Sequence, residues 1–112
     1  MKKITNRVDY QTDTKELALF AKALAHPARI KILKYLLHQS CCYTGDLIDE
    51  LPLAQSTISQ HLKELKNAGL IQGEITPPRT KYCIDEANWK KANELFRFFL
   101  DQNIEGGGSC KI

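Results

Sequence analysis

Residues 53–71 read LAQSTISQHLKELKNAGLI, and this stretch decides the fold. Its apolar side chains recur at helical spacing, as Ile58, Leu62 and Leu65. The pattern predicts a helix that opens at Gln55 or Ser56 and runs to Ala68. Gly69 follows, in the position where a left-handed residue commonly closes a helix.

A shorter helix is expected just upstream, from Thr44 through Leu51, with Thr44 as its cap and Asp46 in its electropositive first turn. The residues expected on its buried face are Leu47, Ile48 and Leu51. Pro52 ends this helix, and a brief turn leads into the next one. Two helices joined by a short turn, the second ending in glycine, are typical of a helix-turn-helix.

Two strands are expected directly after this motif, at residues 70–75 and 80–84, separated by the turn TPPR at residues 76–79. A hairpin in this place is a wing. The predicted fold class is therefore mainly α with a β-hairpin wing, a winged helix-turn-helix.

Helices are also expected before the motif, over residues 14–25 and from Pro27 to about residue 38. They are divided at His26-Pro27, because a residue before proline disfavours the helical conformation. The expected buried side of the second helix is Ile30, Leu33, Leu36 and Leu37. Residues 39–43 then form a short connector.

The last helix is expected from Asp85, its N-cap, to about Asn103. Its apolar face comprises Trp89, Ala92, Leu95, Phe96, Phe99 and Leu100. This face is wider than one small core needs, so we expect it to pack against the first helix and the same helices of a second copy, forming a homodimer. The alternative is that it only closes the core of the monomer.

Length and composition fit one domain, because 112 residues with a hydrophobic fraction of 43% can fill a single modest core. We divide the chain into an N-terminal arm at 1–13, a winged helix-turn-helix and dimerisation domain at 14–104, and a flexible Gly-rich tail with a cysteine at 105–112. No apolar run is long enough to cross a bilayer, and no apolar segment follows the basic N-terminus. A cytoplasmic protein with no membrane partner is expected.

The exposed face of the helix that begins at Gln55 is polar throughout: Gln55, Ser56, Thr57, Ser59, Gln60, His61 and Lys63. Hydroxyl and amide side chains at a helix N-terminus can reach base edges and phosphates. Arg79 and Lys81 on the wing can reach an adjacent groove or phosphate. Double-stranded operator DNA is the predicted partner, and a net charge of +3 is compatible with it. The alternatives are an ordinary solvated helix face and a charged hairpin tip.

Four segments resemble the ArsR/SmtB family of winged-helix repressors: ALAHPARIKIL at residues 23–33, GDL at 45–47, the stretch at 53–71, and the hairpin that ends in KY at 81–82. The resemblance extends over residues 17–99. It implies a dimer built from the first and last helices, with two recognition helices in successive major grooves of a palindromic operator. It also implies that DNA is released when an inducer binds.

The chain has four cysteines, and reduced thiols are expected because no export signal is present. Cys41 and Cys42 are adjacent and lie just before a helix N-terminus, where nearby basic residues and the helix dipole favour thiolate. Thiolates suit trivalent arsenic or antimony, which needs a third sulfur. The predicted metal site is Cys41, Cys42 and Cys110, with Cys83 as the other candidate donor or as a buried strand residue. No cofactor is expected to be required for DNA binding.

The family's own sites differ from this one. In its arsenic- and cadmium-responsive members, a Cys-x-Cys pair directly precedes the Asp-Leu of the third helix, and those positions are Tyr43 and Gly45 here. The zinc-responsive members use Asp and His ligands on the last helix, which has no histidine in this chain.

Two other functions remain open at this stage. Cys41 or Cys42 could form a disulfide or persulfide bridge with Cys110, giving a redox-sensing repressor. The polar helix could instead meet a protein, in which case substitution of Gln60 or Lys63 would leave DNA affinity unchanged. An enzyme is not expected, since nothing at fixed spacing organises a nucleophile, a base and an oxyanion site.

Overall fold

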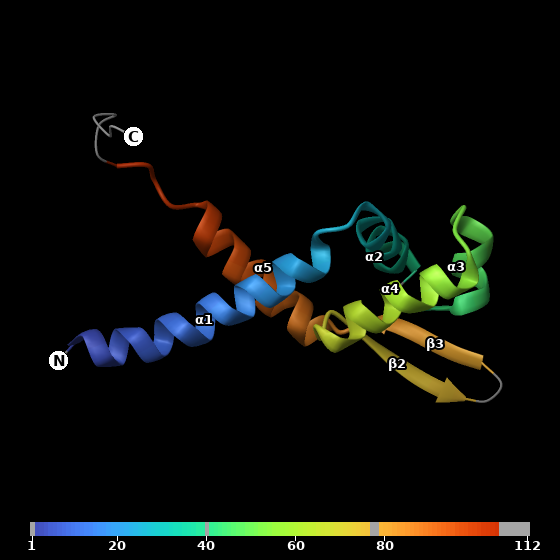
Figure 1. The fold of residues 1–112 in the computed structure, drawn as a ribbon, viewed down its shortest axis with the longest axis horizontal. Helices are drawn as coiled ribbons and strands as arrows, with labels where there is room; N and C mark the ends of the chain where they lie inside the picture. Colours follow the sequence, from blue (N-terminus) through green and yellow to red (C-terminus); the bar gives the residue numbers. More distant parts are fainter. Residues whose placement is uncertain (1, 40, 77–78, 106–112) are drawn as a thin grey trace.

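The computed structural model describes residues 2–39, 41–76 and 79–105. Its elements in chain order are α1 (Lys2–Leu24), α2 (Pro27–Gln39), β1 (Cys41–Tyr43), α3 (Thr44–Glu50), α4 (Gln55–Asn67), β2 (Ile71–Thr76), β3 (Arg79–Ile84) and α5 (Glu86–Leu100). Helices α2, α3 and α4 gather with the strands at one end of the molecule, while the free ends of α1 and α5 project from the other (Figure 1). The expected winged helix-turn-helix is confirmed.

Helix α1 begins at Lys2, and so extends through residues 2–13, which were expected to precede the first helix. The stretch 2–13 contains no glycine or proline to stop a helix. It also lacks an apolar stripe, which is why its periodicity gave no helical signal. The break predicted at His26-Pro27 is confirmed, since α1 ends at Leu24 and α2 begins at Pro27.

The expected connector at 39–43 contains a strand, β1, which was not predicted. It joins the wing in a three-stranded antiparallel sheet of order β1-β3-β2. In this register Cys41 of β1 lies opposite Cys83 of β3. The strand was missed because three residues are too few to show an alternating pattern.

The core lies between the helices and the sheet, and Ile58, Leu62 and Leu65 of α4 are fully buried within it, as predicted. Helix α2 buries Leu33 and Leu36, as predicted, together with Ile32. Ile30 and Leu37 are 37% and 47% exposed, contrary to expectation, because they lie on the flank of that buried stripe.

Helix α4 ends as its sequence predicts. Gly69 has a φ of 87°, in the left-handed region. The backbone N–H of Gly69 donates to the carbonyl of Lys66 at 2.9 Å, and that of Leu70 donates to the carbonyl of Leu65 at 3.1 Å. These two bonds form a Schellman motif, which turns the chain out of the helix and into β2.

The start of α3 differs from expectation, and the start of α5 agrees with it. Tyr43, not Thr44, is the N-cap of α3, and its backbone N–H donates to Asp46 Oδ2 at 3.3 Å. Asp85 caps α5, as predicted, by accepting a hydrogen bond from the backbone N–H of Asn88 at 3.1 Å.

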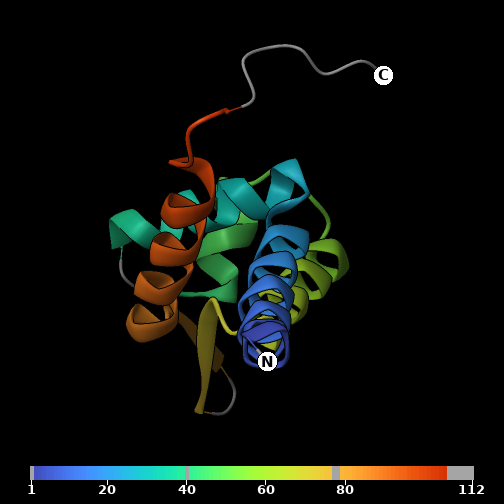
Figure 2. The same cartoon turned by 90° about the vertical axis from the view of Figure 1, so that its left-hand side faces the viewer.

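Helices α1 and α5 lie side by side (Figure 2). Glu16 of α1 forms an ion pair with Lys91 of α5. Among the described residues, no helix is both long enough and apolar enough to span a membrane.

Candidate nucleic-acid interface

The polar face of α4 is exposed, with one exception. All the predicted contact residues on this helix except His61 are accessible to solvent: Gln55, Ser56, Thr57, Ser59, Gln60 and Lys63. The only one of them with a side-chain hydrogen bond in the described part of the chain is Gln60, whose Nε2 donates to Glu64 Oε2 at 3.1 Å. The face is therefore available to a partner.

His61 was predicted to face DNA or solvent, and this prediction is wrong. Its side chain is buried with 6% exposure, and its Nδ1 accepts a hydrogen bond from Arg29 Nε at 3.1 Å. The ring of His26 lies 4.3 Å away, centroid to centroid. Burial, with smaller contributions from His26 and Arg29, lowers the pKa of His61, so the neutral ring suits this place.

The wing and α4 line a common hollow of about 450 Å³. Gln55 and Ser59 form its α4 side, and Arg79 lies on its wing side. The guanidinium of Arg79 lies over the ring of Tyr43, 3.9 Å from the ring centroid, which directs this cation along the hollow's edge. Helix α4 and the wing thus present polar and cationic groups to one side of the molecule.

Lys81 differs from Arg79 because its charge already has a partner. Its Nζ lies 3.1 Å from Glu74 Oε1 on the neighbouring strand, and the Lys81 side chain is 39% exposed. An exposed ion pair of this kind is worth about 0–1 kcal/mol, so the pair can open. Lys81 nevertheless presents less net charge to a phosphate than Arg79 does.

Sequence reasoning missed residues that border the interface. Tyr43, Thr44 and Gly45 line the same hollow, but nothing in the sequence pairs Tyr43 with Arg79. Arg29 of α2 is half-buried, and it donates a hydrogen bond to His61. The burial of His61 could have been predicted from the sequence, because His61 lies three residues after Ile58 and four before Leu65, on the edge of the apolar stripe.

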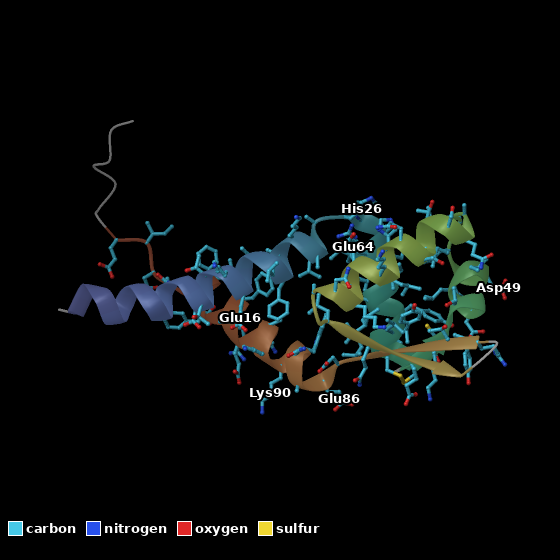
Figure 3. The ribbon with its side chains drawn as sticks, turned by 60° about the horizontal axis from the view of Figure 1, so that its bottom comes forward. Glu16, His26, Asp49, Glu64, Glu86 and Lys90 are labelled. Carbon is cyan, nitrogen blue, oxygen red and sulfur yellow. A yellow bond between two sulfur atoms is a disulfide. The ribbon has the colours of Figure 1, made fainter. Side chains whose placement is uncertain are left out.

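The cysteines are not arranged as predicted. Cys41 forms a disulfide with Cys83, visible as the yellow bond near the strands in Figure 3. The expectation of reduced thiols and of a buried, unpaired Cys83 is therefore wrong in this structure. Strand pairing accounts for the difference, because it sets the two residues opposite one another.

Cys42 also contradicts the expectation of a thiolate. It is buried in the core, and burial, followed by the charge of Asp46, raises the pKa of its thiol to about 11. Successive side chains of a strand point to opposite faces, so Cys41 and Cys42 face different surroundings. Cys110 lies outside the described residues, and within the described ranges no group of three possible metal ligands occurs.

Residues 26–72 match the family model described as bacterial regulatory protein, arsR family. The regulator CmtR of Mycobacterium tuberculosis is 34% identical over 85 residues, which cover 75% of this chain and 71% of CmtR. The chain belongs to the arsR family. The repressor SmtB of M. tuberculosis is 45% identical over 53 residues, covering 47% of this chain and 38% of SmtB.

Solved structures support the same assignment. HlyU from Vibrio cholerae superimposes with a TM-score of 0.64 at 29% identity, covering 80% of this chain and 96% of that one. This arsR-family protein is therefore a DNA-binding transcriptional regulator with a winged helix-turn-helix, and not an enzyme.

Proposed function

We propose that this arsR-family protein is a homodimeric, cytoplasmic repressor that binds a palindromic operator through α4 and the wing and releases it when a thiol-reactive inducer binds. The observation that carries the proposal is the common hollow, where Gln55 and Ser59 of α4 meet Arg79 of the wing on one exposed side. Amide and hydroxyl groups can read base edges while the cation neutralises a phosphate.

The homodimer is supported by apolar side chains that the monomer leaves uncovered. Leu19 of α1 is 58% exposed, and the end of α5 carries Phe98, Phe99 and Leu100 at 76%, 57% and 70% exposure. A second copy joined through the same two helices would bury these side chains, and would carry two α4 helices for two half-sites.

For the inducer we propose trivalent arsenic or antimony, bound by cysteine thiolates. Cys41 and Cys83 line a cavity, so their sulfurs are open to a thiophilic ion once the disulfide is reduced. Cys110 remains the proposed third donor. Cys42 could join only if β1 left the core, since its thiol is buried there.

The experiment begins with selection of an operator from random-sequence duplexes, followed by measurement of affinity against salt concentration. We expect a palindrome and an affinity that falls steeply with salt, because phosphate contacts release counterions. Gln60→Ala and Lys63→Ala should weaken binding, and Glu86→Gln on α5 is the matched control. Unchanged affinity in both α4 variants would indicate that this face meets a protein instead of DNA.

The inducer is tested on reduced protein bound to that operator. Arsenite, antimonite, cadmium, zinc and a persulfide donor are titrated separately while DNA release is followed. Arsenite and antimonite are expected to release the DNA at the lowest concentrations. Cys41→Ser and Cys110→Ser are expected to abolish this release. A response to the persulfide donor alone, lost in Cys110→Ser, would favour the redox function with a bridge to Cys110.

A further inference from the structure

The disulfide between Cys41 and Cys83 encloses the DNA-reading part of the molecule. It joins β1 to β3, with 4.1 Å between the two Cα atoms and a sequence separation of 42 residues. The loop that it closes contains α3, α4 and β2. One bond therefore fixes the helix-turn-helix to the returning strand of the wing.

Strand β1 is short and is coupled directly to α3. It has three residues, and its last residue, Tyr43, is also the N-cap of α3. No linker separates the two elements, so a shift of β1 carries the start of α3 with it. Helix α3 contacts α4, and Tyr43 lies under Arg79, so the same shift alters both sides of the hollow.

The two cysteines of the disulfide border a cavity. Cys41 and Cys83 line a cavity of about 970 Å³ between the sheet and the start of α5, which also contributes Trp89 and Lys90. Lys90 is labelled on α5 in Figure 3. A volume of this size is in the range of pockets that admit small ligands, so a low-molecular-weight thiol can reach the sulfurs.

We propose that Cys41 and Cys83 form a reversible thiol–disulfide exchange site, opened by a small thiol from this cavity, and that the closed disulfide holds the wing and helix-turn-helix in the arrangement that binds DNA more tightly. The part that concerns DNA rests on the proposed function. The site is distinct from a bridge to Cys110, because both of its sulfurs belong to the sheet.

The exchange is balanced by two molecules of the small thiol. Its thiolate attacks one sulfur of the pair, forming a mixed disulfide and releasing the other sulfur as a thiolate, which takes up a proton. A second small thiolate attacks the outer sulfur of the mixed disulfide, and the small disulfide leaves. The protein gains two electrons and two protons as both cysteines become thiols, and a small disulfide reverses the steps.

Cys42 does not compete in this exchange. It is the one unpaired cysteine among the described residues, it is buried, and the raised pKa of its thiol keeps the thiolate scarce near neutral pH. The alternation of the strand also directs it away from the cavity. Exchange is therefore confined to the Cys41–Cys83 pair.

The test uses the full chain equilibrated in glutathione buffers of graded redox ratio. Alkylation and mass spectrometry follow the pair, while circular dichroism checks that the reduced protein stays folded. Hydrogen exchange of β1 and α3 amides is measured in both states, together with affinity for the selected operator. We expect the disulfide to form and open reversibly with the fold retained. In the oxidised form we expect slower hydrogen exchange of the β1 and α3 amides and tighter DNA binding, by at least about fivefold.

Two variants decide the assignment. Cys83→Ser should remove the redox dependence of both amide hydrogen exchange and DNA affinity, whereas Cys110→Ser should retain it. The proposal is overturned if the pair is reduced only on unfolding, or if amide hydrogen exchange is the same in both redox states. It is also overturned if the reduced form binds DNA as tightly as the oxidised form, or if Cys110→Ser abolishes the redox dependence. If neither form binds any duplex, the proposed function fails, and hydrogen exchange still decides whether the pair fixes β1.

Discussion

The contact between Arg29 and His61 joins α2 to α4 and depends on the protonation state of His61. Protonation would remove the acceptor at His61 Nδ1 and add a charge beside the Arg29 guanidinium. Because the pKa of His61 is lowered, the unfolded chain binds its proton more readily than the folded chain. This contribution to stability is full above the ordinary value of 6.5 and is lost as pH falls through the lowered pKa.

We therefore expect the free energy of unfolding to fall as pH decreases below 6.5, and to fall less in a His61→Gln variant, whose side chain does not titrate. Arg29→Met should cost about 1 kcal/mol at pH 7.5 by removing the donor. Urea unfolding at several pH values measures both. Equal pH dependence in the parent and in His61→Gln would contradict the assignment of the proton to His61.

Gly69 offers a second test at the scale of one residue. Its φ of 87° disfavours any side chain, and an added Cβ would lie 2.9 Å from Asn88 Nδ2, which donates to the Gly69 carbonyl. Gly69→Ala should destabilise the protein by about 1–2 kcal/mol. Gly45→Ala is the matched control, since nothing lies within 4 Å of its added Cβ and the residue is helical. It should instead stabilise by about 0.5–1 kcal/mol, as urea midpoints would report.

At the scale of elements, the sequence predicted those whose signals are local. The stripe of α4 and its closing glycine lie within one stretch of chain, and so do the strands of the wing. The start of α1 was missed because residues 2–13 carry no apolar stripe to indicate a helix. Strand β1 and the pairing of Cys41 with Cys83 depend on a register between segments far apart in the chain. No local pattern encodes such a register.

The wing yields a prediction of its own. Arg79 presents its cation beside α4, whereas the charge of Lys81 is partnered by Glu74. Arg79→Ala should weaken operator binding about tenfold near 0.1 M salt and lower the slope of log affinity against log salt by about one. Lys81→Ala, the matched change on the same strand, should have a smaller effect on both. Fluorescence anisotropy over a salt series measures the affinity and its salt dependence. A larger loss of affinity in Lys81→Ala than in Arg79→Ala would show that Lys81, not Arg79, is the main cation of the wing.

At the scale of the whole molecule, the two ends of the structure carry different kinds of surface. The polar hollow lies at the sheet end, between α4 and the wing. The uncovered apolar side chains belong to α1 and α5, the two helices whose free ends form the far end (Figure 1). If the far end joins two copies, affinity for a palindrome depends on residues that touch no DNA. The two half-sites would then be bound by one particle, and the second contact would gain from a high effective concentration.

Phe99→Asp tests this dependence, because a charge on the uncovered face opposes burial against a second copy. We expect sedimentation to show a monomer, and affinity for the full palindrome to fall by about 10²-fold or more, toward that of a single half-site. Lys90→Asp is the matched control, nine residues earlier and so on the opposite side of α5. It should remain dimeric. A Phe99→Asp protein that stays dimeric, or a monomer that binds the palindrome as tightly as the parent, would show that α5 does not join the copies.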